Sequence, residues 1–216
     1  ALEQAPGVDI VLFGRMVASD PSLNTDACAQ VAHSLSTHKV TNEFDYFTAV
    51  DDMSPEDTAG AGHIGTVEFN SATLYRYATL AVHELHQLLP EGSPDAAAAF
   101  VDAFVRSMPT GKQNTFANRT LPDAVLVCLR RDQPVNMVGA FERPVRASES
   151  GYAAESAERL VKHAQTVYED FVEAPFQSLV AGQGLDALGD KMPLSKLLET
   201  VKASIAAQLE PAGETA

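Results

Sequence analysis

The sequence has no tryptophan, only two cysteines and no apolar run of the length that crosses a bilayer. Cys28 and Cys128 lie far apart without CxxC spacing, which favours two inert thiols in a reducing cytosol over a disulfide or a metal site. A membrane-spanning helix needs about 20 consecutive apolar residues, and no charged-then-apolar leader opens the chain. We therefore expect a soluble, cytoplasmic protein without a membrane partner.

Basic residues are also scarce, because 15 lysines and arginines face 29 acidic residues and give a formal net charge of -14. This balance disfavours a non-specific nucleic-acid binder, whose affinity comes from neutralising phosphates. Ten of the 15 basic residues fall within residues 1–149, so a local basic surface is still possible. With 216 residues, 45% of them hydrophobic, the chain predicts one domain or one domain with an insertion.

Two segments with alternating polar and apolar residues lie in the first half of the chain. Thr37–Val50 and Gly65–Thr79 are rich in β-branched and aromatic residues, which predicts two strands. Asp51–Gly62 (DDMSPEDTAGAG) separates them and predicts a flexible loop. Upstream, Val8–Met16 predicts a buried strand, and the apolar spacing through Ala27–Ser36 predicts an amphipathic helix. Together these patterns indicate a long ribbon with a flexible tip.

The rest of the chain alternates helical and strand patterns. Helices are predicted at Val82–Leu89, Pro94–Met108, from Ala153 onward and at Pro193–Leu209. A polar loop at Gly111–Arg119, a strand at Asp123–Arg131 and a glycine-rich break at Ala181–Asp190 separate them. Strands separated by helices, with one inserted ribbon, predict an α+β fold with a sheet of the RNA-recognition-motif or ferredoxin type.

Five sequence segments carry a family resemblance: VDIVLFGRM, QVAHSLSTHKV, DYFTAVDD, GTVEFNSATLYRYA and GKQNTFA. In this order and at these spacings they resemble CasC, the guide-RNA-binding backbone subunit of type I-E CRISPR Cascade complexes. The resemblance implies a hand-shaped fold, with residues 1–36 as part of the palm, 37–77 as a β-ribbon thumb and 78–216 as the rest of the palm with C-terminal helices. The family's first palm strand, a basic segment and helical fingers precede the VDI segment, and they have no counterpart here, so we expect a truncated or trimmed product.

The resemblance also implies a function. Copies of the subunit polymerise along crRNA, displace bases at intervals with the thumb and present the spacer for pairing with target DNA. The implied partners are crRNA, further copies of the chain, other Cascade subunits and, in the assembled complex, target DNA. It implies a structural protein, not an enzyme, and no cofactor or metal.

A wedge that unstacks bases needs apolar or aromatic side chains held near a strand end. The candidates that match the family's positions near the displaced base are Met16, Tyr46, Phe47, Val50 and Ile64. Tyr46 and Phe47 are adjacent, so they face opposite sides of a strand and at most one can pack inward. The alternative is that one of them simply packs the base of the ribbon.

Polar side chains near the same segments suit phosphate or ribose oxygens. The candidates are Arg15, His38, Lys39, Lys112, Gln113, Asn114 and Arg119. The loop that carries the last four is equally typical of an ordinary solvated turn. The run Arg130-Arg131 and the pair Arg143 and Arg146 suit contacts with other subunits or with target DNA, although solvated surface positions are favoured. Arg76 suits stacking or a phosphate contact, although an ion pair with an acidic neighbour is favoured.

Two rival functions remain open. Type III relatives of this family cut target RNA with a thumb-loop aspartate, so Asp51 or Asp52 suggests a metal-dependent endoribonuclease, although adjacent carboxylates in a glycine-rich loop favour a solvated tip. His83 and His86 are three residues apart and do not have the spacing of a zinc-binding H-E-x-x-H helix. The other rival is an acidic interaction module that binds no nucleic acid.

Overall fold

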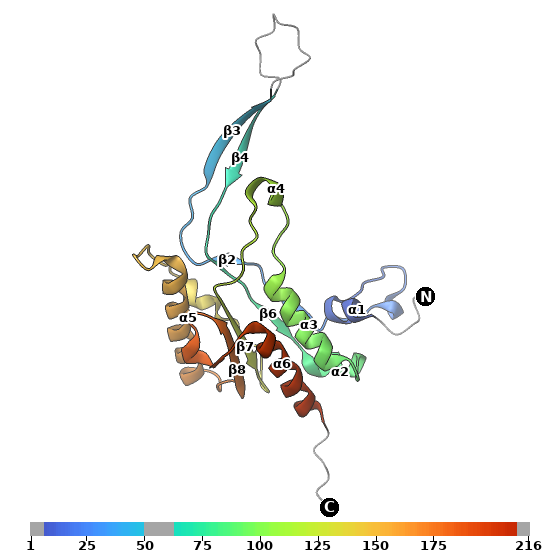
Figure 1. The fold of residues 1–216 in the computed structure, drawn as a ribbon. Helices are drawn as coiled ribbons and strands as arrows, with labels where there is room; N and C mark the ends of the chain where they lie inside the picture. The colour runs from blue at the N-terminus through green and yellow to red at the C-terminus, as the bar shows by residue number, and fades with distance from the viewer. Residues whose placement is uncertain (1–6, 50–62, 211–216) are drawn as a thin grey trace, which may run out of the picture.

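The computed structural model describes residues 7–49 and 63–210. Its central layer is a sheet in the order β7-β8-β9, formed by Ala124–Leu129, Gln177–Gly182 and Asp190–Lys191. β7 and β8 are antiparallel, with Cys128 opposite Ser178, and β8 and β9 are parallel. Side chains alternate between the two faces of this sheet, and both faces are covered by helices (Figure 1).

The larger core lies between one face of the sheet and helices α3 (Ser93–Arg106) and α6 (Leu194–Leu209). Leu179 of β8 and Leu197 of α6 are fully buried there. Helix α5 (Gly151–Asp170) covers the other face, with the short helix η2 (Met137–Phe141) beside it. Phe141 and Val145 form a second, smaller core on that side.

A two-stranded ribbon projects from this body (Figure 1). Strands β3 (Glu43–Ala49) and β4 (His63–Phe69) pair antiparallel, from Glu43 opposite Phe69 to Ala49 opposite His63. The alternating segments therefore form a hairpin, as predicted. The predicted second strand is split, because β5 (Leu74–Tyr75) and β6 (Ala78–Leu80) follow β4 as separate short strands. The predicted loop Asp51–Gly62 lies outside the described residues.

Two predictions near the N-terminus are wrong. The expected buried strand at Val8–Met16 is mainly a helix, α1 (Val8–Phe13), which ends at Gly14 with φ 78°. A short apolar run between glycines fits a strand and a buried helical turn equally well. The expected helix at Ala27–Ser36 is instead β1 (Ala29–Val31), paired with β6, and β2 (Leu35–Ser36), paired with β5. A spacing of four residues also fits alternation by two, and the partner strands selected that alternative.

The later helices agree with the sequence patterns. α2 is Val82–Leu88, α3 ends two residues before the predicted Met108, α5 begins two residues before the predicted Ala153, and α6 closes the described chain. β8 was not predicted, since its sequence merges into the glycine-rich break that also holds η3 (Asp186–Leu188). A one-turn helix, α4 (Gln113–Phe116), lies in the predicted polar loop, and η1 is Pro21–Leu23. Within the described part of the chain, no helix has the length and apolarity to cross a membrane.

Candidate nucleic-acid interface

One face of the ribbon exposes large apolar side chains. The register pairs Tyr46 with Thr66 and Thr48 with Ile64, so Phe44, Tyr46 and Ile64 lie on the same face. These three side chains are 60%, 75% and 66% exposed. Large apolar groups rarely stay in water without a function when they cluster. Sequence reasoning found Tyr46 and Ile64 but missed Phe44, which the same alternation places beside them.

Phe47 lies on the opposite face of the ribbon, where its cross-strand partner is Gly65. A Cβ atom built on Gly65 would be 2.4 Å from Phe47 Cζ, so the ring lies directly over this glycine. Phe47 is still 44% exposed. Neither Tyr46 nor Phe47 is buried in the body of the molecule, and the absence of a side chain at residue 65 provides the space for the Phe47 ring.

The described part of the ribbon is acidic. Its strands carry Glu43, Asp45 and Glu68, and residues 43–49 and 63–69 contain no lysine or arginine. Such a surface repels phosphates, so any contact of the ribbon with nucleic acid has to use bases rather than the backbone.

A basic hollow lies where the ribbon joins the body. It encloses about 650 Å³ and its charged lining consists of Lys39, Arg143, Arg146 and Arg159. Val145 N–H donates to Thr37 O at 2.9 Å, and His38 and Val145 form a parallel bridge, so strand pairing brings the arginine segment beside Lys39. Arg159 on α5 donates to Arg143 O. The four cations thus come from three separate parts of the sequence.

Sequence reasoning interpreted Arg143 and Arg146 as solvated surface residues. Both are exposed, but they share the hollow with Lys39, more than a hundred residues earlier. The only local signal was the density of basic residues in ERPVR. The hollow also lies at the first turn of the 20-residue helix α5, through Tyr152, and the N-terminal end of a helix adds positive potential.

His38 supports a wall of this hollow. Its ring stacks on Tyr152 with centroids 3.7 Å apart and planes 12° apart. Nε2 accepts from Thr73 N–H at 3.1 Å, and Nδ1 lies 2.9 Å from Lys39 O. A neutral ring with its proton on Nδ1 satisfies both contacts. Because both ring nitrogens have partners within the chain, the contribution of His38 to the hollow is to hold Tyr152 and the Lys39 backbone in place.

The loop with Lys112, Gln113 and Asn114 is an ordered turn. Lys112 and Ala117 flank α4 with φ values of 58° and 49°, and the Arg119 guanidinium donates to Gln113 Oε1 at 2.9 Å. Lys112 and Asn114 are exposed, whereas the Gln113 amide oxygen is occupied by Arg119. This loop lies beside the ribbon and not at the basic hollow (Figure 1).

The remaining candidates lie elsewhere. Arg15 Nε donates to Leu23 O at 2.8 Å, which ties the loop after α1 to itself. Met16 in that loop is 85% exposed. Figure 1 shows α1 on the side of α3 that faces away from the ribbon. Val50, Asp51 and Asp52 lie outside the described residues.

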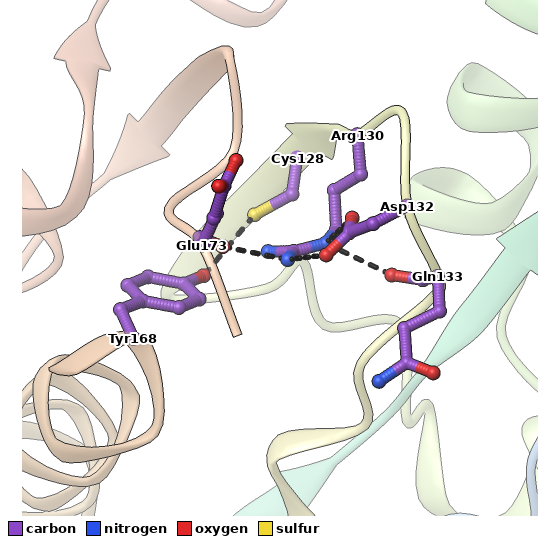
Figure 2. A network of polar contacts seen from close by, with 6 residues as sticks. All are labelled: Cys128, Arg130, Asp132, Gln133, Tyr168 and Glu173. Atoms are coloured by element: carbon purple, nitrogen blue, oxygen red, sulfur yellow. Dashed lines mark hydrogen bonds and ion pairs between the residues drawn. The ribbon is translucent and has the colours of Figure 1, made fainter. Parts of the chain in front are cut away.

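A polar network at the end of β7 stabilises the body (Figure 2). Arg130 donates to both carboxylate oxygens of Asp132, at 2.8 and 2.6 Å, and to Glu173 O at 2.6 Å. Its side chain is only 8% exposed, so it is not a solvated surface residue, and its third nitrogen, Nη1, is buried without a partner among the described residues. Cys128 Sγ lies 3.8 Å from the Tyr168 hydroxyl. Burial raises the pKa of both groups, which keeps them neutral and unsuited to nucleophilic chemistry.

Three further predictions from the sequence can be compared with the structure. Cys28 and Cys128 are free thiols. Arg76 stacks on the Phe104 ring, with its guanidinium carbon 4.4 Å from the ring centre, which is a stacking contact and not the favoured ion pair with an acidic neighbour. In residues 7–49 and 63–210, no three histidine, cysteine or acidic side chains are placed to hold a metal ion.

The fold is that of the class of subunits found in CRISPR RNA-guided surveillance complexes. A chain of a solved "CRISPR RNA-guided surveillance complex" is 34% identical with a TM-score of 0.80, over 93% of this chain and 78% of that one. A chain of a complex described as "pre-nicking" is also 34% identical, with a TM-score of 0.81, over 93% of this chain and 55% of that one.

The chain belongs to the family of CT1975-like proteins, whose model matches residues 1–206. No curated protein matches it. The chain spans 55% and 78% of the lengths of the two solved relatives. The resemblance to a Cascade subunit is confirmed at the level of family and fold, and the mixed helix and strand architecture agrees with it. The assignment to type I-E stays a prediction.

Proposed function

We propose that the chain is the guide-holding part of a Cascade backbone subunit, a structural RNA-binding protein that polymerises along crRNA and presents the spacer to target DNA. The observation that carries this proposal is the acidic ribbon with an exposed aromatic face, rising beside a basic hollow. In this view residues 1–36 and 78–216 form the RNA-recognition-like palm and residues 37–77 form the thumb.

The hollow and the ribbon have different roles, since the hollow binds phosphates and the ribbon contacts bases. The hollow holds guide phosphates through Lys39, Arg143 and Arg146, three exposed cations around one concave site. Binding of phosphates to these cations releases counterions from the RNA, which provides affinity. The rest of the surface cannot provide it, because the chain has a net charge of -14. The exposed lysine of the α4 loop, Lys112, adds a phosphate or ribose contact further along the ribbon.

The ribbon displaces bases. Stacking of one base on an aromatic side chain contributes about 1–3 kcal/mol, which offsets the few kcal/mol needed to unstack it. Tyr46 and Ile64 offer such a surface on one face, with Phe47 on the other. Met16 follows α1, which lies away from the ribbon (Figure 1), and it would act on a displaced base from a neighbouring copy of the chain.

The endoribonuclease alternative depends on Asp51 and Asp52, which lie outside the described residues. The acidic interaction module is less favoured, because the basic hollow is built by strand pairing between distant segments and has no use in that function.

To test the proposal, crRNA binding by the full-length subunit is measured against salt concentration for the variant Lys39→Ser/Arg143→Ser/Arg146→Ser. Three lost phosphate contacts, at about 0.7 counterion each, reduce the affinity about 100-fold at 0.1 M salt and flatten the log–log salt slope by about 2. The matched control is Lys191→Ser/Lys196→Ser/Lys202→Ser, which removes the same charge around β9 and α6. An equal loss of affinity in both variants contradicts a phosphate site at the hollow.

A further inference from the structure

The ribbon is braced from the side by the loop between α3 and β7. Phe69, the last residue of β4, meets Phe116 of α4 with ring centres 4.8 Å apart and planes at 65°, an edge-to-face contact. Figure 1 shows α4 at the end of two extended segments, next to the lower part of the ribbon. We define residues 107–123 as the bracing loop.

The bracing loop is built to hold Phe116 in one place. Lys112 and Ala117, on either side of the single helical turn, adopt left-handed backbone conformations that residues other than glycine rarely take. Phe116 N–H donates to Lys112 O at 2.9 Å and Ala117 N–H to Gln113 O at 2.9 Å. The side-chain bond from Arg119 to Gln113 closes the turn. Such conformations persist only where the surroundings over-determine them.

Most side chains of the described ribbon strands lie in solvent. Residues 41–48 are all exposed, and most of 64–69 are too. At its root, Asn70 Nδ2 donates to Asn42 Oδ1 at 2.8 Å, a bond that joins the two strands to each other and not to the body. A two-stranded hairpin of this kind bends readily, so a lateral contact decides its direction.

We propose that Phe116 is a positioning residue that fixes the direction of the ribbon and thereby how far its apolar face enters the base stack. This inference rests on the proposed function for its consequence, but the contact itself is a property of the RNA-free chain. An edge-to-face pair changes the population of the docked arrangement about 2- to 10-fold. Loss of the ring therefore lets the ribbon sample other directions without unfolding the body, whose cores do not contain Phe116.

The test measures ribbon direction and base displacement separately. Spin labels at Thr66 on the ribbon and Lys162 on α5, both exposed, report the distance distribution in the RNA-free, full-length subunit. We expect Phe116→Ala to broaden the distribution, Phe69→Ala to do the same, and the double variant to add nothing further, since both remove one contact. Phe116→Tyr should restore the narrow distribution. Phe171→Ala, which removes another exposed ring at the end of α5, is the control.

The second arm follows 2-aminopurine in crRNA assembled with the same variants. Base displacement raises 2-aminopurine fluorescence, and we expect this rise to be about 2- to 10-fold smaller in Phe116→Ala than in the wild type. Phe116→Tyr should restore it. An unchanged distance distribution in Phe116→Ala overturns the brace. A broadened distribution with unchanged displacement overturns its role in positioning. If wild-type subunit binds no crRNA while the distribution still broadens, the proposed function fails and the brace on the ribbon stands.

Discussion

Substitution of Gly65 by alanine should move the Phe47 ring while leaving the stability of the ribbon almost unchanged. A methyl group at residue 65 would lie 2.4 Å from Phe47 Cζ and 2.6 Å from Cε1, whereas ordinary contacts are 3.4–4 Å. The ring therefore has to move by about 1 Å or more, which costs about 0.5–1.5 kcal/mol in side-chain strain. Replacing glycine within a strand returns about 0.5–1 kcal/mol. The two effects nearly cancel in the free energy of unfolding.

We accordingly expect Gly65→Ala to change Tm by no more than a few degrees while reducing base displacement in assembled crRNA, read as 2-aminopurine fluorescence. Gly92→Ala is the control, because Gly92 lies outside the ribbon and the bracing loop and a Cβ atom there would come no closer than 3.1 Å to the Leu89 side chain. Phe47→Ala sets the scale for complete loss of the ring. If Phe47→Ala abolishes displacement and Gly65→Ala leaves it at the wild-type level, the position of the ring over Gly65 has no bearing on the wedge.

Three further predictions concern the body and the rival chemistry. Arg130→Met should destabilise the fold by about 0.5–1.5 kcal/mol in urea unfolding, since water can replace the donor to the exposed Glu173 carbonyl. Asp132→Ala should destabilise it more, because the Arg130 side chain, only 8% exposed, then keeps its charge with less compensation. The reverse order would contradict this account. Burial raises the pKa of Tyr75 to about 12, so the neutral hydroxyl contributes its full stabilisation below pH 10. This contribution, at most about 2–3 kcal/mol, is lost as the pH rises to 12. If Tyr75→Phe loses stability with rising pH as steeply as the wild type does, this assignment is refuted. Finally, Mg²⁺ should produce no target-RNA cleavage, and cleavage that disappears in Asp51→Ala or Asp52→Ala would favour the endoribonuclease.

Local patterns predicted the elements whose stability is local. The ribbon strands and the helices α3, α5 and α6 follow from alternation and from apolar stripes, because each carries several repeats of its own period. The residues around Val11 and Gln30 carry too few repeats to distinguish helix from strand. There, pairing with β6 and burial against the body decided the outcome.

The site was harder to predict than the fold because its parts are distant in sequence. Alternation predicted that Tyr46 and Phe47 face opposite sides of the ribbon, whereas Tyr46 and Ile64 were selected as candidates through the family resemblance. The basic hollow could not be predicted in this way, since the pairing of Val145 with Thr37 is what brings Lys39 and Arg143 to line the same hollow. The contact of Phe69 with Phe116 likewise joins the ribbon to a loop that sequence patterns describe only as polar.

The most direct test of the central claim places 2-aminopurine at successive single positions along the crRNA spacer and assembles each guide with the full-length subunit and its Cascade partners. The account predicts high fluorescence at regularly spaced positions, where bases are unstacked, and low fluorescence between them. Tyr46→Ala together with Ile64→Ala should flatten this pattern while leaving crRNA bound through the hollow. Fluorescence that is uniform along the spacer of the wild-type assembly would contradict the proposal that this ribbon displaces bases.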